Sequence, residues 1–203
     1  MGSCSSNSTH WIYDVFLSFR GEDTRKSLVA DLYVALSNKG ILTFMDDELP
    51  RGMGIKPELE RAIEGSRISI VIFSKNYSSS SWCLNELLKI MDCCATYNQV
   101  IVPVFYDVDP SDVRHQKGRF GEHLDALDAT PDMLSKWKTV LTKAANISGW
   151  DASIFSQDYD LVDHIGYWVW GDWVKQPWPK SSTIGFMADS SIDVSLKILE
   201  KLV

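Results

Sequence analysis

Between residues 13 and 150 the chain alternates short apolar runs with segments whose apolar residues recur at the helical period. The first run, residues 13–19 (YDVFLSF), is apolar on both faces, as in a strand buried inside a sheet. Residues 24–39 repeat leucine every four positions and stop at Gly40, which predicts a helix. This alternation is typical of βαβ units and predicts a parallel sheet.

The same pattern assigns the remaining elements. Further strands are expected at 41–45, 68–73, 100–106 and 147–150. Further helices are expected at 57–64, at 82–97 and between the loop at 107–117 and residue 146. The expected fold class is therefore α/β, with a five-stranded parallel sheet and helices on both of its faces.

The alternating pattern ends at Trp150 and divides the chain into three parts. Residues 1–11 form a serine-rich leader that we expect to be flexible, and residues 12–150 form the core of the domain. Residues 151–203 form a tryptophan-rich insertion followed by a helix at 190–203 that would complete the domain. The apolar positions of this last segment also alternate, so that a strand is an alternative there.

Four tryptophans fall in the insertion, at Trp168, Trp170, Trp173 and Trp178. We expect them to pack on the domain, because tryptophan is rarely left exposed. A surface for a partner or for a membrane interface is the alternative.

Composition narrows the possible functions. With 203 residues, of which 45% are hydrophobic, the chain can build one sizeable core. Its net charge of −7 disfavours nucleic acid as a partner, because a phosphate backbone requires clustered basic residues. The histidines and cysteines lack the spacing of metal ligands, so that no bound metal is expected. No apolar run is long enough to span a bilayer.

Four motifs, in order along the chain, resemble the signatures of the plant TIR (Toll/interleukin-1 receptor/resistance) domain family. They are YDVFLSFRGEDTR at 13–25, DDELPRG of the BB loop at 46–52, SWCLNEL at 81–87 and PVFYDVDPSDVR at 103–114. The resemblance implies a flavodoxin-like sheet with the strand order 2-1-3-4-5. It points to a TIR-only immune protein, or to a fragment of a longer one.

The resemblance also implies cleavage of NAD⁺, with Glu86 of SWCLNEL as the catalytic carboxylate. Breaking the bond between nicotinamide and ribose passes through an oxocarbenium-like centre, which a nearby carboxylate stabilises. NAD⁺ or NADP⁺ would then be the substrate, and no cofactor is expected. The alternative for Glu86 is a glutamate that only stabilises the helix dipole.

Ligands of open parallel sheets bind beyond the carboxyl ends of the strands, near the switch in strand order. Glycine permits close backbone approach there, and arginine pairs with phosphate. The candidates for nucleotide binding are Phe19, Arg20, Gly21, Arg51, Gly52, Ser74 and Trp82. The alternative role for Trp82 is packing in the core, and the alternative role for Ser74 is forming a turn. Cys83 is either a reactive thiol or, as we prefer, a small packing residue.

The expected partners follow from the family as well. They are further copies of the chain through TIR–TIR contacts, other TIR proteins and a pathogen effector. Ala30-Asp31 stands where plant relatives commonly have a Ser-His or Asp-His pair, and a carboxylate facing its own copy would disfavour that contact. Weak self-association and low basal activity are therefore expected. The main alternative function is a non-catalytic TIR scaffold that acts by recruiting other TIR domains, and a nuclease is a third that the acidic charge disfavours.

The N-terminus carries a lipidation pattern. Residues 1–6 (MGSCSS) match the N-myristoylation motif at Gly2, and a palmitoyl group on Cys4 would add a second anchor. The chain would then be cytoplasmic and held at the plasma membrane. A small-residue leader that matches by coincidence is the alternative, and the chain would then be cytoplasmic without an anchor.

Overall fold

The computed structural model describes residues 11–45 and 57–174. Several predictions concern residues outside these ranges: the acylation of Gly2 and Cys4, the roles of Arg51 and Gly52, and the helix at 190–203.

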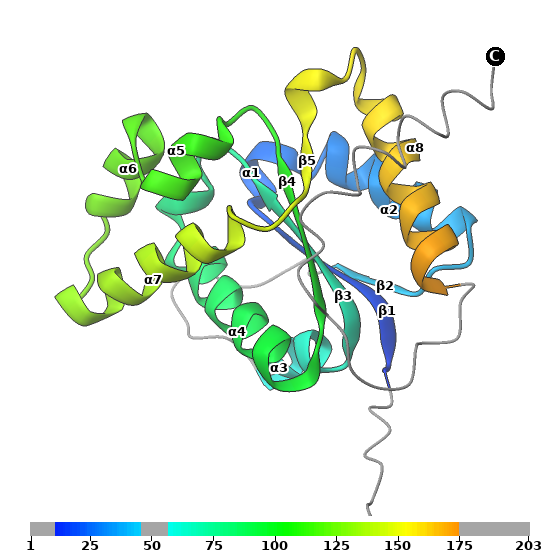
Figure 1. The fold of residues 1–203 in the computed structure, drawn as a ribbon, viewed down its shortest axis with the longest axis horizontal. Helices are drawn as coiled ribbons and strands as arrows, with labels where there is room; N and C mark the ends of the chain where they lie inside the picture. Colours follow the sequence, from blue (N-terminus) through cyan, green and yellow to red (C-terminus); the bar gives the residue numbers. More distant parts are fainter. Residues whose placement is uncertain (1–10, 46–56, 175–203) are drawn as a thin grey trace, which may run out of the picture.

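Five parallel strands form the sheet at the centre of the described residues (Figure 1). They are β1 (Tyr13–Phe19), β2 (Thr43–Met45), β3 (Ser66–Phe73), β4 (Val100–Phe105) and β5 (Trp150–Asp151). Their order is β2-β1-β3-β4-β5, which confirms the predicted fold class. The switch in order lies between β1 and β3, whose pairing sets Ser18 opposite Val71.

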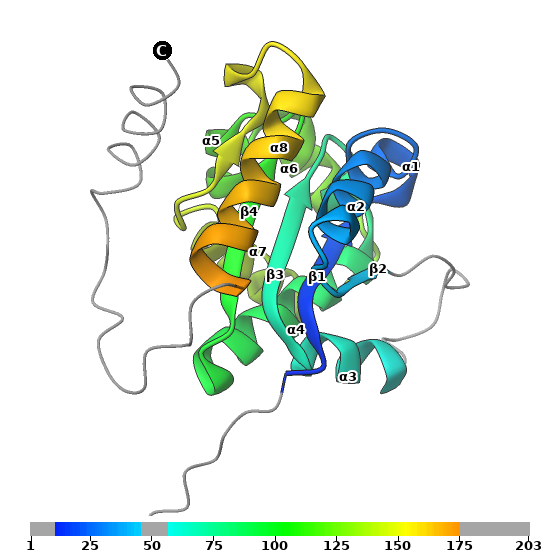
Figure 2. The same cartoon turned by 90° about the vertical axis from the view of Figure 1, so that its right-hand side faces the viewer.

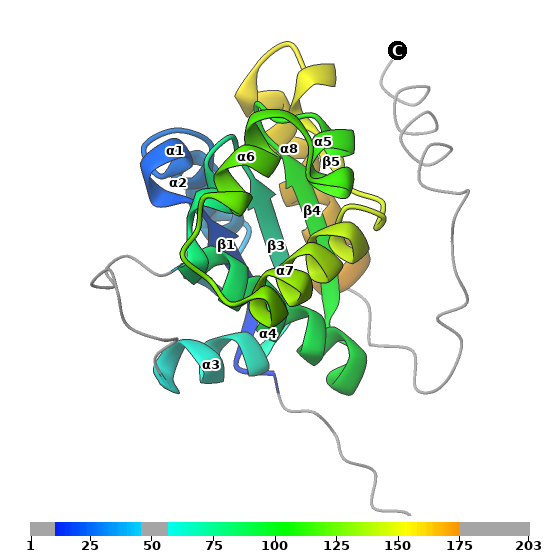
Figure 3. The same cartoon turned by 90° about the vertical axis from the view of Figure 1, so that its left-hand side faces the viewer.

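Helices cover both faces of the sheet. They are α1 (Gly21–Thr24), α2 (Leu28–Asn38), α3 (Pro57–Glu64), α4 (Ser81–Tyr97), α5 (Pro110–His115), α6 (Gly118–Asp125), α7 (Pro131–Ala144) and α8 (Asp158–Trp168). Shorter turns are η1 (Tyr77–Ser79), η2 (Ala152–Ile154) and the π-helical η3 (Val169–Val174). Figure 2 shows α2 and α8 in front of one face of the sheet, and Figure 3 shows the opposite layer with α3, α4 and α7.

The sheet separates two apolar cores because successive strand side chains point to opposite faces. On β1, Phe16 packs with α3, α4 and α7, whereas Leu17 and Phe19 pack with α2 and α8. Ser18 lies between Leu17 and Phe19 and points to the α4 side, where its hydroxyl bonds to Glu86.

The predicted helix at 24–39 is divided in two. Residues 25–27 interrupt it between α1 and α2. The hydroxyl of Thr24 donates to the Arg20 carbonyl, and that of Ser27 donates to the Thr24 carbonyl. Such local side-chain bonds compete with the helical ladder, which accounts for the break.

The segment expected to be an insertion contains a helix that the sequence pattern did not predict. This helix, α8, packs on α2 and begins seven residues after β5 ends. The further helix expected at 190–203 lies outside the described residues and stays a prediction. Its buried residues are Leu161, Val162, Ile165 and Gly166. The ring of Trp168 meets that of Trp150 edge to face, with centroids 5.4 Å apart. Trp168 and Trp170 both pack against this core, as we expected, whereas the packing of Trp173 and Trp178 stays a prediction.

None of the helices within 11–45 and 57–174 is long and apolar enough to cross a membrane.

Candidate active site

Glu86 lies in the second turn of α4, directly behind the carboxyl end of β1. The start of α4 is fixed by Ser80, whose hydroxyl accepts a hydrogen bond from the Cys83 backbone N–H at 3.3 Å. A serine in this position satisfies one of the unpaired N–H groups of a helix start. Glu86 is only 5% exposed, so that it is not the solvent-facing glutamate that a helix-dipole role alone would favour.

Three elements meet at this carboxylate. The hydroxyl of Ser18, on β1, donates to Glu86 Oε2 at 2.9 Å. The hydroxyl of Tyr77, on η1, lies 3.1 Å from both Ser18 Oγ and the Cys83 carbonyl oxygen, and its single hydrogen can be donated to either of these acceptors. Ser18 and Tyr77 are fully buried, so that the cluster is shielded from water.

Two of the neighbouring ionisable groups, Cys83 and Tyr77, stay neutral at physiological pH. Burial, with the charge of Glu86 as a further cause, raises the pKa of the Cys83 thiol to about 12. Burial, followed by the charges of Cys83 and Glu86, holds the pKa of Tyr77 well above its usual range. A thiolate is the nucleophilic form of cysteine, and therefore Cys83 is a packing residue rather than a reactive thiol.

The residues that follow β1 lie around the cluster in different ways. The ring of Phe19 packs in the core on the opposite face, and only its carbonyl oxygen reaches the cluster, where the Cys83 thiol donates to it at 3.6 Å. Arg20 forms an ion pair with Glu22 at 2.8 Å, and its charge lowers the pKa of Cys83, against the effect of burial. Gly21 opens α1, where a Cβ atom would lie 3.1 Å from the guanidinium of Arg25.

Ser74 is brought to a neighbouring cluster instead. It is buried at the end of β3, and its hydroxyl donates to Asp23 at 2.5 Å. Asn76 donates twice to the same carboxylate, from its backbone N–H and from its side-chain amide, both at 2.9 Å. Burial would raise the pKa of Asp23, but these bonds and the charge of Arg20 outweigh it and lower this pKa. A hollow of about 160 Å³ adjoins these residues.

Trp82, the second residue of α4, is half-buried and packs on the core between the sheet and α4. This contact is the core packing considered above as its alternative role.

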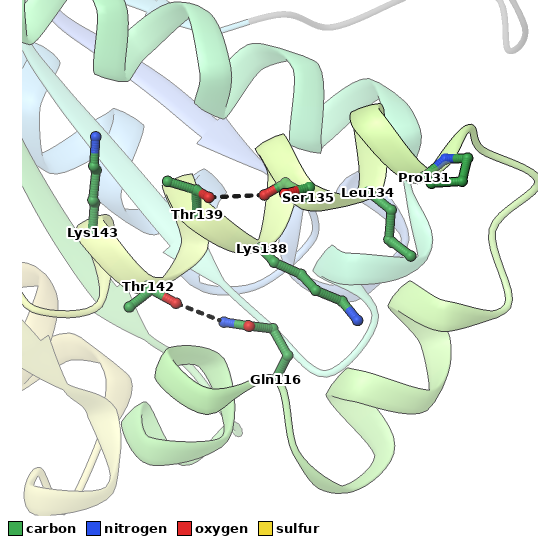
Figure 4. Close-up of a pocket in the computed structure, with 8 residues that line it drawn as sticks. All are labelled: Gln116, Pro131, Leu134, Ser135, Lys138, Thr139, Thr142 and Lys143. Carbon is green, nitrogen blue, oxygen red and sulfur yellow. Dashed lines mark hydrogen bonds between the residues drawn. The ribbon is translucent and has the colours of Figure 1, made fainter.

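A larger groove, of about 660 Å³, lies along α7, and Glu86 is not among the residues that line it (Figure 4). Two of its polar side chains bond to each other, Gln116 to Thr142 at 3.2 Å, and Lys138 pairs at 2.8 Å with Asp125, which does not line the groove. Glu86, by contrast, is a buried carboxylate at the switch in strand order. Because buried ionisable groups in such positions mark functional sites, we assign the candidate active site to Glu86 and not to the groove.

No group of three or more potential metal ligands occurs within residues 11–45 and 57–174.

Sequence reasoning missed Ser18 and Tyr77. The available signal was Ser18 itself, which is a polar residue flanked by Leu17 and Phe19 in an otherwise apolar strand. A polar side chain buried in this way needs a hydrogen-bond partner. The alternation of side chains along a strand predicts the face of the sheet to which Ser18 points, but only the folded structure shows its hydrogen-bond partner.

Comparison with known proteins agrees with these observations. A family model described as the TIR domain matches residues 12–188. The disease resistance protein RPV1 of Vitis rotundifolia is 53% identical over 152 residues, which are 72% of this chain and 11% of that protein. The TMV resistance protein N of Nicotiana glutinosa is 51% identical over 166 residues, which are 79% of this chain and 14% of that protein. The chain therefore spans only a small part of the length of these curated relatives.

Among solved structures, the TIR domains in the structure of the activated Roq1 resistosome, described as directly recognising the pathogen effector XopQ, superpose with a TM-score of 0.71. The sequence identity is 49%, and the match covers 75% of this chain and 96% of that one.

Proposed function

The chain belongs to the TIR domain family, and from this premise we propose that it is an NAD⁺ hydrolase that signals in plant innate immunity and cell death. The bond that breaks joins nicotinamide to the ribose. Nicotinamide leaves as a neutral molecule with the bonding electron pair, and water adds to the sugar to give ADP-ribose and a proton. An internal nucleophile of the nucleotide in place of water would give a cyclic product.

The observation that carries this proposal is the environment of Glu86. Its carboxylate is nearly inaccessible to solvent and lies behind the end of β1, beside the switch in strand order. A negative charge in such surroundings is screened little, so that it stabilises an oxocarbenium-like ribose far better than an exposed carboxylate would. No cofactor is needed, because the leaving group is already activated by its positive charge.

Substrate binding would use groups around this carboxylate. Arg20 is partly exposed, with 22% of its side chain accessible, and it would exchange its bond to Glu22 for a substrate phosphate. Arg51 and Gly52 of the BB loop are proposed to complete the site. NAD⁺ and NADP⁺ both meet these requirements.

We propose that self-association activates the chain, because a relative of high identity is described as part of a resistosome. Asp31 is exposed on α2, so that a symmetric contact through this helix would bring two carboxylates together. Activity is therefore expected only at high protein concentration or with a crowding agent.

The experiment compares nicotinamide release by the wild-type chain, Glu86→Gln and Glu122→Gln across a protein concentration series. Glu86→Gln is expected to lower turnover roughly 100-fold or more, since the substitution removes the charge and keeps the shape. Glu122, exposed on α6, provides the matched control and should leave turnover unchanged. Size-exclusion chromatography checks that all three proteins assemble equally.

The alternative, a scaffold that acts through TIR–TIR contacts, makes the opposite prediction. An assembled wild-type protein that releases no nicotinamide would support the scaffold and overturn the hydrolase.

A further inference from the structure

We propose that Ser18 and Tyr77 are positioning residues that fix the orientation of the Glu86 carboxylate through one continuous chain of hydrogen bonds. The effect of these hydrogen bonds on turnover rests on the proposed hydrolase function, whereas their effect on Glu86 itself does not.

The two residues are held rigidly by the surrounding fold. Ser18 is paired within the sheet opposite Val71, and Tyr77 meets the ring of Phe73 edge to face with centroids 5.0 Å apart. Neither side chain is exposed to solvent. Water therefore does not compete for their hydroxyl groups, and the hydrogen bonds they make are stronger than the same bonds at the surface.

The number of hydroxyl hydrogens decides the direction in which the hydrogen bonds between Tyr77, Ser18 and Glu86 are donated. Ser18 has one hydroxyl hydrogen, and this hydrogen is donated to Glu86. The oxygen of Ser18 can then only accept from Tyr77, whose single hydrogen lies between two acceptors at equal distances of 3.1 Å, Ser18 Oγ and the Cys83 carbonyl oxygen. An ionised Glu86 polarises Ser18 and favours donation from Tyr77 to it. Tyr77 thus acts on the Glu86 carboxylate through Ser18 and not by direct contact.

The protonation states permit this arrangement. The ionisable groups that act on the cluster include Tyr77 from η1, Cys83 from α4 and Arg20 from the end of β1. Burial keeps the pKa of Tyr77 well above its usual range, so that the tyrosine retains its hydrogen at physiological pH.

The test compares Ser18→Ala, Tyr77→Phe and the control Ser69→Ala in the full chain. Each substitution removes one hydroxyl group and adds no atoms. Ser69 is likewise buried, on β3, but its hydroxyl has no hydrogen-bond partner among the described residues. It therefore reports the cost of removing a strand hydroxyl that does not touch Glu86.

For turnover of NAD⁺, Ser18→Ala is expected to lower kcat about 10-fold or more, and Tyr77→Phe about 3-fold, with KM changed less than about 2-fold. The acid limb of the kcat profile should move to higher pH in both variants, because the ionised carboxylate loses a donor. Ser69→Ala should leave kcat, KM and the profile unchanged. Unaltered or increased turnover in Ser18→Ala would contradict a positioning role.

A second measurement does not depend on catalysis. The carboxyl ¹³C resonance of Glu86 is followed against pH in protein labelled at glutamate, with Glu86→Gln used for assignment. Its titration midpoint should rise most in Ser18→Ala, less in Tyr77→Phe and not in Ser69→Ala. Identical midpoints in all variants would overturn the inference, even if the chain cleaves NAD⁺. Shifted midpoints in a protein that does not cleave NAD⁺ would support the inference and contradict the hydrolase function.

Discussion

At the scale of single residues, Asp23 shows how one side chain ties separate segments together. It lies on α1, and its three bonds to Ser74 and Asn76 fix the loop that leads from β3 to α4. This loop ends where the helix that carries Glu86 begins, so that Asp23 supports the site from outside it.

We predict that Asp23→Ala lowers the free energy of unfolding by about 1–3 kcal/mol at pH 7, because three donors lose their charged acceptor. Urea unfolding measures this difference. Asp128→Ala, in an exposed loop position, should change stability by less than about 0.5 kcal/mol. Equal effects of the two substitutions would show that the Asp23 bonds contribute nothing.

The same bonds predict a dependence on pH. The pKa of Asp23 is lower in the folded chain than its ordinary value of 3.8, so that the unfolded state takes up the proton first as the pH falls. The contribution of Asp23 is therefore fully present above about pH 5 and is lost as the pH falls through the folded pKa. The difference between wild type and Asp23→Ala should shrink progressively as the pH falls below about 5 in urea titrations.

Cys83 gives a third prediction for a single residue. Its thiol has a pKa of about 12, and almost none of it is thiolate at pH 8. Iodoacetamide should leave Cys83 unmodified in the folded chain and modify it in urea, as mass spectrometry of the peptides would show. Rapid labelling of the native Cys83 would require an accessible, ionised thiol and would contradict the packing role.

The sequence located the carboxylate of the candidate site but not its surroundings. Glu86 stands out because it falls within a motif, and motifs are contiguous. Ser18 and Tyr77 are separated from it in sequence by 68 and 9 positions and act only through the fold. Phe19 was chosen for its place at the end of a strand, but its ring points to the other face because side chains alternate along β1.

At the scale of elements, periodicity predicted those with unbroken apolar patterns. The prediction for β1 matched the observed strand, and that for α3 matched the observed helix. It failed where local hydrogen bonds decide, as at the division between α1 and α2. Periodicity also did not predict α8. Residues 151–188 were assigned as an insertion because of their tryptophans, although Leu161, Val162 and Ile165 have the apolar spacing of a helix.

If α8 closes the core over α2, truncating its buried face should destabilise the whole domain. Ile165→Ala is expected to lower the free energy of unfolding by about 2–5 kcal/mol, from lost burial and the cavity left behind. Tyr159→Ala, on the exposed side of the same helix, should cost less than about 1 kcal/mol. Similar losses for both would mean that α8 does not contribute to the core in the way described.

At the scale of the whole molecule, the sheet separates two layers whose side chains meet different partners. Substitutions in the two layers should therefore act independently. Ile90→Val, on the buried face of α4, and Ile165→Val, on the buried face of α8, are each expected to lower the free energy of unfolding by about 0.5–1.5 kcal/mol. Their double variant should match the sum within about 0.5 kcal/mol in urea unfolding. A larger deviation would indicate coupling across the sheet.

This separation bears on how such a chain can diversify. The layer of α3, α4 and α7 holds the carboxylate of the candidate site, and Glu86 accepts a buried hydrogen bond there. The outward side of α2 and α8 takes no part in that bond. Substitutions on that outward surface can therefore change what the domain recognises while the buried surroundings of Glu86 stay the same.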